Sequence, residues 1–152
     1  MTLERWRRLL PGLWAGGLLC VALLAAPSAF ATLLPSDAGR MVACLFAQEA
    51  HTSLVIAVLL LLLQRAQARR GEAAQFGLEM ALVLGTIACT VAGYFVVVPM
   101  MEAARFGQGT LGFGQWHALS MLLFAVKGLL VLALAWRAAC RPEPLPTRPA
   151  SS

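Results

Sequence analysis

Four long apolar runs within a chain of 152 residues constrain the fold more than any other feature of the sequence. They cover roughly residues 9–34, 44–63, 76–101 and 116–136. A bilayer core about 30 Å thick needs about 20 helical residues to cross it, and three runs exceed that length. The second reaches it only when Gln48, Glu49 and His51 lie within the span. Such runs predict transmembrane helices, because barrel strands would alternate apolar and polar residues.

The composition supports the same fold class. Hydrophobic residues make up 60% of the chain and charged residues only 12%, about half the share found in soluble domains. A soluble protein of this size could not bury so much apolar surface. We therefore predict an all-α membrane protein: a four-transmembrane-helix bundle over residues 1–140. A Pro-rich, disordered cytoplasmic tail is expected over residues 141–152, since that composition cannot form a packed core.

Basic residues are concentrated in alternate connections, and this distribution predicts the topology. Nine of the twelve lysines and arginines lie in three segments: Arg5, Arg7 and Arg8 before the first run, Arg65, Arg69 and Arg70 after the second, and Arg137, Arg141 and Arg148 after the fourth. The other two connections carry one each, Arg40 and Arg105. Because cytoplasmic loops are enriched in Lys and Arg, we expect both termini inside. The arginines then serve topology and contact with anionic lipid, and no nucleic-acid partner is expected.

The N-terminal segment imitates a secretory signal. Arginines precede an apolar stretch that leads to Ala29-Phe30-Ala31, a sequence that looks like a cleavage site. The stretch is longer than a usual signal core and continues into Leu33 and Leu34. We therefore expect an uncleaved first helix.

Small residues recur at every fourth position of the third run and predict a close helix contact. The stripe consists of Gly77, Ala81, Gly85, Cys89 and Gly93, and a shorter version in the first run consists of Gly12 and Gly16. Small side chains allow neighbouring backbones to approach, so we expect the third helix at the centre of a compact bundle. Pro27 and Pro99 each remove one helical hydrogen bond and are expected to kink the first and third helices.

Polar side chains within the runs are the candidates for a functional site, because an ionisable group inside a membrane is costly. The candidates are Glu49, His51, His117, Ser120 and Lys127. Glu49 and His51 lie about 200° apart on a helix, so they cannot face the same neighbour. His51 must then face a second neighbour, another subunit or lipid. His117 is expected near an interface, as an anchor.

Two polar faces are expected to meet near the middle of the membrane. Lys127 shares a helix face with Ser120, seven residues earlier, and Glu49 shares its face with Thr52 and Ser53. Together these side chains would line a small hydrophilic cavity. The pair of charges would either fix the register of the helices or form part of a proton or ion pathway.

Lys127 needs a carboxylate partner, and the expected depth of the two side chains in the membrane favours Glu49. Counted from the outer ends at 1.5 Å per residue, Glu49 is about 13 Å deep and Lys127 about 16 Å deep. Glu79 is the alternative partner, but it is expected close to the inner interface, where water can reach it. We therefore predict a Lys127–Glu49 ion pair.

Three segments of the chain together resemble a known family. They are Phe46 with Glu49-Ala50; Gly93-Tyr94-Phe95 with Pro99-Met100 and Arg105; and Phe113-Gly114 with His117 and Ser120. In these segments the chain resembles the bacterial membrane family called domain of unknown function 4149, which is similar to eukaryotic transmembrane protein 205. The resemblance extends over all four helices, departs at Ala118 and does not include Lys127. It implies a multi-pass protein of the bacterial inner membrane and, by analogy, export or metal handling.

Three classes of function stay open. The first is a non-enzymatic membrane component that assists transport, export or envelope upkeep. The second is a haem- or copper-handling protein with His51 and His117 as ligands, although the four cysteines form no metal motif and no cofactor is predicted. The third is an oligomeric channel or proton-coupled carrier, for which four helices per chain would require a homo-oligomer. We expect the lipid bilayer as the partner, and neither catalytic residues nor enzyme activity are expected.

Overall fold

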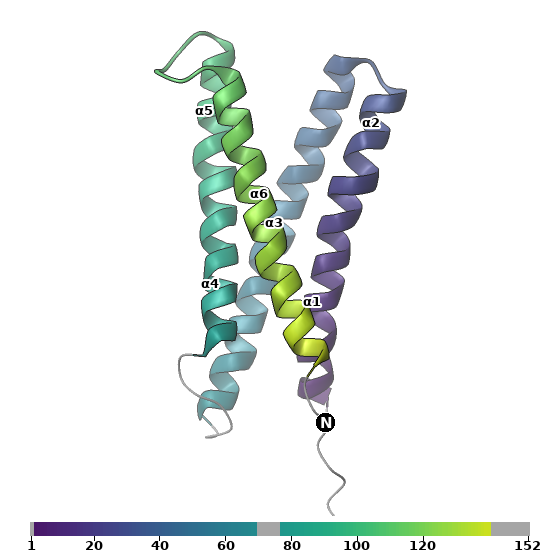
Figure 1. Cartoon of the computed structure of the whole chain (residues 1–152), viewed down its shortest axis with the longest axis vertical. Helices are drawn as coiled ribbons and strands as arrows, with labels where there is room; N and C mark the ends of the chain where they lie inside the picture. The colour runs from purple at the N-terminus through teal and green to yellow at the C-terminus, as the bar shows by residue number, and fades with distance from the viewer. Residues whose placement is uncertain (1, 70–76, 141–152) are drawn as a thin grey trace, which may run out of the picture.

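The computed structural model describes residues 2–69 and 77–140, which form four long helical rods (Figure 1). The first rod consists of α1 (Thr2–Cys20), η1 (Val21–Ala25) and α2 (Ala26–Thr32), and the second is α3 (Pro35–Arg69). The third consists of α4 (Leu78–Thr90), η2 (Val91–Val97) and α5 (Val98–Arg105), and the fourth is α6 (Phe113–Ala139). No strand occurs in these residues, so the all-α prediction is confirmed for them. The expected tail, residues 141–152, lies outside the described residues.

Each rod is long and apolar enough to cross a membrane. The qualifying segments are Arg5–Thr32, Pro35–Arg69, Leu78–Arg105 and Phe113–Ala139. Only 17–22% of the most apolar stretch of each segment is buried inside the bundle, so most of its side chains face outward. A soluble monomer does not expose contiguous apolar surface on this scale. The four rods thus indicate a multi-pass membrane protein, as predicted.

The second rod is longer than its apolar run. α3 begins at Pro35 rather than near residue 44, so the connection from α2 consists of only Leu33 and Leu34. Arg40, which we had assigned to a connection, lies within the early turns of α3 and donates a 2.6 Å hydrogen bond to Asp37. Hydropathy missed this start because exposed polar residues can continue a helix without being apolar.

The two prolines expected to kink helices lie just after π-helical segments. Pro27 lies in the first turn of α2, directly after η1, and Pro99 lies in the first turn of α5, directly after η2. Proline has no N–H to donate to the carbonyl four residues earlier, and a wider turn is one way in which a helix accommodates that loss. The interruption is absorbed locally, and each rod continues past its proline.

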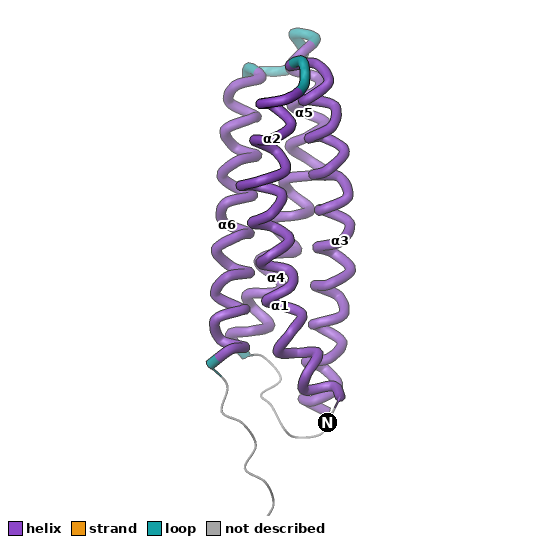
Figure 2. Tube along the Cα trace, turned by 90° about the vertical axis from the view of Figure 1, so that its right-hand side faces the viewer, coloured by secondary structure: helices purple, strands orange, loops and turns teal. Residues whose placement is uncertain are grey.

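Every rod lies beside two others, so the third rod is not central as we had expected. The pairs in contact are α1 with α6, α6 with α4, α4 with α3, and α3 with α1. All four contribute to one apolar core, with Trp14 from α1, Leu60 from α3, Val83 from α4 and Val131 from α6. The bundle is therefore a ring of four helices around that core. Figure 2 shows the rods running side by side along their length.

The two ends of the bundle differ. The α2–α3 and α5–α6 connections lie at one end, called the outer end here, and the N-terminus lies at the other, the inner end (Figure 1). Toward the outer end α2 packs on α3 and η1, whereas α5 packs on α6 and η2. These two pairs of helices diverge toward the outer end, so the four rods meet mainly in the inner and middle parts (Figure 1).

Part of the small-residue stripe lies at a helix contact, as predicted. A Cβ atom placed on Gly85 would lie 3.1 Å from Cδ1 of Leu130 in α6. One placed on Gly93 would lie 3.8 Å from Cβ of Leu123 in the same helix. Close approach of α4 and η2 to α6 therefore depends on the absence of a side chain at Gly85 above all.

The remaining glycines of both stripes were also expected at close helix contacts. Within this chain they make none, so the prediction is wrong for them. A Cβ atom at Gly12, Gly16 or Gly77 meets nothing within 4 Å. Ala81 is exposed and Cys89 is half-buried. The buried face of the third rod runs beside the stripe, through Val83, Thr86, Thr90 and Val97. A stripe of period four rotates by about 40° per step, so it cannot stay on one flat contact.

Candidate functional site

The helix boundaries bring Glu49 and Lys127 to the same height in the bundle. Glu49 lies fourteen residues after Pro35, the first residue of α3, and Lys127 lies fourteen residues after Phe113, the first residue of α6. Both helices begin at the outer end, so each residue lies about 21 Å along its helix (Figure 1). The two side chains therefore need no long reach to meet.

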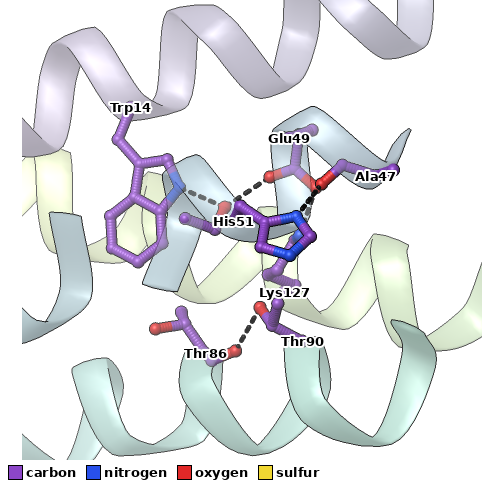
Figure 3. Close-up of polar contacts among 8 residues, drawn as sticks. Trp14, Ala47, Glu49, His51, Thr86, Thr90 and Lys127 are labelled. Carbon is purple, nitrogen blue, oxygen red and sulfur yellow. Dashed lines mark hydrogen bonds and ion pairs between the residues drawn. The ribbon is translucent and has the colours of Figure 1, made fainter. Parts of the chain in front are cut away.

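Lys127 and Glu49 form a buried ion pair, as predicted from their depths. The Nζ atom of Lys127 donates a 2.6 Å hydrogen bond to Oε2 of Glu49 (Figure 3). The two side chains are only 4% and 9% exposed. A charge-assisted hydrogen bond of this length is strong, and each charge offsets the cost of burying the other.

Two further side chains complete the pair's hydrogen bonding. The Ser53 hydroxyl donates to Oε1 of Glu49, so both carboxylate oxygens have a donor. The indole Nε1 of Trp14 donates a 2.8 Å hydrogen bond to Oγ of Ser53. Trp14, Glu49, Ser53 and Lys127 thus form a chain of hydrogen bonds from α1 through α3 to α6 (Figure 3), which we call the core network.

Aromatic rings lie beside the core network, one helical turn closer to the outer end. The Nζ atom of Lys127 lies 5.0 Å from the ring centroid of Phe124, within the range of a cation–π contact. The Phe124 ring meets that of Phe46 edge to face, with centroids 5.1 Å apart. This ring pair joins α6 to α3 beside the ion pair.

The α4 side of the network carries two buried threonines. Thr86 donates a 2.7 Å hydrogen bond to the carbonyl of Val83, and Thr90 donates a 2.8 Å hydrogen bond to the carbonyl of Thr86. Both threonines are at least 96% buried, and both lie near the core network (Figure 3). Each hydroxyl donates within its own rod, so no donor from α4 is directed at Glu49.

A second ion pair lies toward the inner end. Arg7 of α1 donates a 3.4 Å hydrogen bond to Glu79 of α4, and the side chains are 10% and 22% exposed. We had expected Glu79 to be an interfacial anchor or the alternative partner of Lys127. The pair lies at a small recess lined by Arg7, Pro11, Leu60, Gln64, Glu79, Leu134 and Ala138. All four rods contribute to this recess.

The two histidines lie apart. His51 is exposed on α3, and its ring meets the edges of Tyr94 and Phe95 in η2, with centroids 5.5 and 6.3 Å away. His117 is exposed in the second turn of α6 and stacks on Phe113 at 5.9 Å. Counted from the starts of their helices, His51 is about 24 Å deep and His117 about 6 Å deep. One metal ion would need both ring nitrogens about 2 Å away, so the two do not form a joint site in this chain.

Two other expected members are not part of the core network. Ser120 is half-buried, two turns closer to the outer end than Lys127, and Thr52 is exposed. The predicted hydrophilic cavity is instead a tightly bonded cluster. Within residues 2–69 and 77–140 no group of three or more His, Cys, Asp or Glu side chains is placed to hold a metal ion.

Sequence reasoning missed Trp14 and the Arg7–Glu79 pair. An indole N–H within an apolar span needs an acceptor, so a hydrogen bond from Trp14 to a polar side chain could have been predicted. Its partner was not predictable, because the face that α1 presents to α3 was unknown. Arg7 had been assigned to topology alone, so no partner for Glu79 was sought on α1.

Comparison with known families gives one match. The model of the domain of unknown function DUF4149 matches residues 9–110. That segment contains most of the first rod and all of the second and third, with Trp14, Glu49 and Ser53, but not α6 with Lys127, so the match is shorter than the four-helix resemblance we had expected. No curated protein and no solved structure matches the chain.

Proposed function

The chain belongs to the DUF4149 family, and from that premise we propose that it is a non-enzymatic, multi-pass component of the bacterial inner membrane. In this proposal it assists transport, export or upkeep of the envelope by holding a rigid helical bundle in the membrane. The observation that carries it is the closed core network, in which Lys127 and Glu49 form a 2.6 Å ion pair.

The chemistry of the network favours a structural scaffold over a reactive site. Both oxygens of Glu49 accept hydrogen bonds, one from Ser53 and one from Lys127. A group acting as acid or base must be within hydrogen-bond reach of the proton it transfers, and here that reach is used by protein partners. The network instead connects α1, α3 and α6 at one height, which fixes how far each helix is inserted.

The charge distribution supports an orientation with both termini in the cytoplasm. The Arg7–Glu79 recess then faces the cytoplasm, and the α2–α3 and α5–α6 connections face the periplasm. The similarity to transmembrane protein 205 that the sequence resemblance implies favours export as the assisted process, by analogy.

A deletion strain tests this function. Loss of the protein should raise sensitivity to envelope stress or to exported toxic compounds, and the wild-type chain should restore resistance. The double variant Lys127→Met with Glu49→Gln should restore it as well, provided that it reaches the membrane at the wild-type level. A deletion strain with no envelope or export phenotype would contradict the proposal.

A proton-coupled carrier is the second candidate, and one observation favours it. The inner recess and the core network lie at different heights of the same bundle, separated by apolar core residues that include Ala57 and Val131. That arrangement resembles a half-channel that ends at a charged site. Liposomes that contain the wild-type chain would then take up protons, and liposomes that contain the double variant would not. That result would support the carrier over the scaffold.

A further inference from the structure

We propose that α3 pairs with α3 of a second copy of this chain to form a two-fold symmetric dimer within the membrane. The contact is an exposed face of α3 that we call the α3 seam, made of Cys44, Gln48, His51, Val55, Val58 and Leu62. The inference rests on the proposed function, because it takes the chain to lie in the membrane. It adds a partner for the bundle, namely a second copy of the chain.

The spacing along the seam is that of a coiled coil. Its residues follow one another at intervals of four, three, four, three and four, which is a repeat of 3.5. Such a repeat keeps one face of a helix against a supercoiled partner. From Cys44 to Leu62 the seam extends about 27 Å, nearly the whole apolar thickness of a bilayer.

Apart from His51, whose ring meets Tyr94 and Phe95 of η2, the seam is not covered by the other rods of the chain. Val55 is 60% exposed, Val58 49% and Leu62 59%. Cys44, Gln48 and His51 are exposed as well. The opposite side of α3 carries Ala50, Ser53, Ala57 and Leu60, which are buried in the bundle.

The polar residues of the seam distinguish it from an ordinary lipid-facing surface. Polar side chains within membrane helices usually face other helices, because lipid offers them no hydrogen bonds. Gln48 nevertheless points away from its own bundle. Within the described residues its amide Nε2 donates only to the thiol of Cys44, at 3.8 Å, which leaves the stronger capacity of the amide for an external partner.

His51 lies one turn further along the seam with its ring orientation fixed. Its Nδ1 lies 2.7 Å from the carbonyl oxygen of Ala47, and since a carbonyl only accepts, Nδ1 carries the proton. Contacts with Tyr94 and Phe95 hold the ring from the side of η2. In the neutral imidazole, Nε2 is then an acceptor at the edge of the seam.

These features select a second copy as the occupant. Two copies with the same membrane topology present α3 in parallel, and a two-fold axis places each seam residue opposite its own equivalent. Gln48 suits that arrangement because its amide both donates and accepts, so two such amides can pair reciprocally. A single polar residue in an apolar seam also fixes the register of the two helices.

Thiol crosslinking in isolated membranes tests the dimer. One full-length variant keeps Cys44 alone, with Cys20, Cys89 and Cys140 changed to Ala. The matched control keeps Cys20 alone, which is exposed on α1, away from the seam. A short thiol-to-thiol crosslinker should convert the Cys44 variant to a covalent dimer and leave the Cys20 variant monomeric.

A substitution that does not depend on the thiols provides the second arm. Gln48→Leu should weaken self-association in detergent by about tenfold, the effect of losing two reciprocal interhelical hydrogen bonds. Gln108→Leu, the same change in the exposed outer connection, should leave association unchanged. Circular dichroism of both variants should show that the helices are intact.

Three results would overturn the dimer. In the first, the Cys44 variant stays monomeric in the membrane. In the second, the Cys44 variant crosslinks only to a different protein. In the third, the Gln48→Leu variant self-associates as strongly as the Gln108→Leu variant. Absence of the chain from the membrane fraction would contradict the proposed function as well, so failure of the dimer and failure of the function are distinguishable.

Discussion

Lys127 and Glu49 lie 78 positions apart in the chain and meet in a 2.6 Å ion pair near the middle of the bundle. The pair links the second rod to the fourth, and Ser53 and Trp14 extend it to the first. The ring of Phe124 lies beside it, and the buried threonines of α4 lie near it (Figure 3). A charge pair in this position fixes how α3 and α6 slide relative to one another, because a shift of one turn would separate the charges by about 5 Å.

Removing one member of this pair should destabilise the protein more than removing both. Lys127→Met leaves a buried carboxylate and Glu49→Gln leaves a buried ammonium, and breaking such a pair costs about 3–5 kcal/mol. The double variant leaves neither charge, so it should recover part of the loss. Thermal melting of the four proteins in detergent provides the double-mutant cycle. Losses that simply add would refute the coupling.

Trp14 should stabilise the fold through its indole N–H as well as through the apolar contacts of its ring. Trp14→Phe keeps an aromatic ring in the core but removes the donor to Ser53, so we expect a loss of about 1–2 kcal/mol in unfolding free energy. Trp136→Phe is the matched control, because Trp136 is 74% exposed. Equal melting temperatures for both variants would show that the hydrogen bond contributes nothing measurable.

The ion pair could be predicted from the sequence, whereas its surroundings could not. Counting residues from the ends of apolar runs gives the depth of Lys127 relative to Glu49 to within a turn, and the cost of an isolated charge supplies the pairing. Which face of α1 meets α3 depends on packing of the whole ring. The bond from Trp14 to Ser53 therefore required the structure.

Patterns based on side-chain size were less reliable than patterns based on charge. The stripe from Gly77 to Gly93 gave the contact at Gly85, but it misjudged Gly77, and Gly16 on α1 has no neighbour within this chain. A small residue permits close packing without requiring it. A buried charge requires a partner, so its position carries more information.

The topology can be tested with two reporter fusions. Fusions at Gln108, in the outer connection, and at Ala150, in the tail beyond the described residues, should report opposite compartments. The physical reason is the excess of arginine in the segments expected to be cytoplasmic. Reporters in the same compartment would contradict the orientation. Intact mass is the accompanying check, since loss of about 31 residues would identify the first helix as a cleaved signal.

Gly85 should be the least replaceable glycine of the third rod. A Cβ atom there would already lie 3.1 Å from Leu130, so the larger side chain of Gly85→Leu must push α4 away from α6. Overpacking of this kind costs about 1–3 kcal/mol, which should appear as a lower melting temperature in detergent.

The control for this substitution has to come from outside the core. Val97→Leu, an apolar change off the stripe, is not a neutral control, because Val97 is only 3% exposed and enlarging it would also strain the core. Gly16→Leu is the better match, because a Cβ atom at Gly16 meets nothing within 4 Å and the added side chain points outward from α1. Gly16→Leu should melt at least as high as the wild type, since leucine also favours helix more than glycine. If Gly16→Leu were the more damaging of the two, α1 rather than α4 would carry the close contact, through a partner outside this chain.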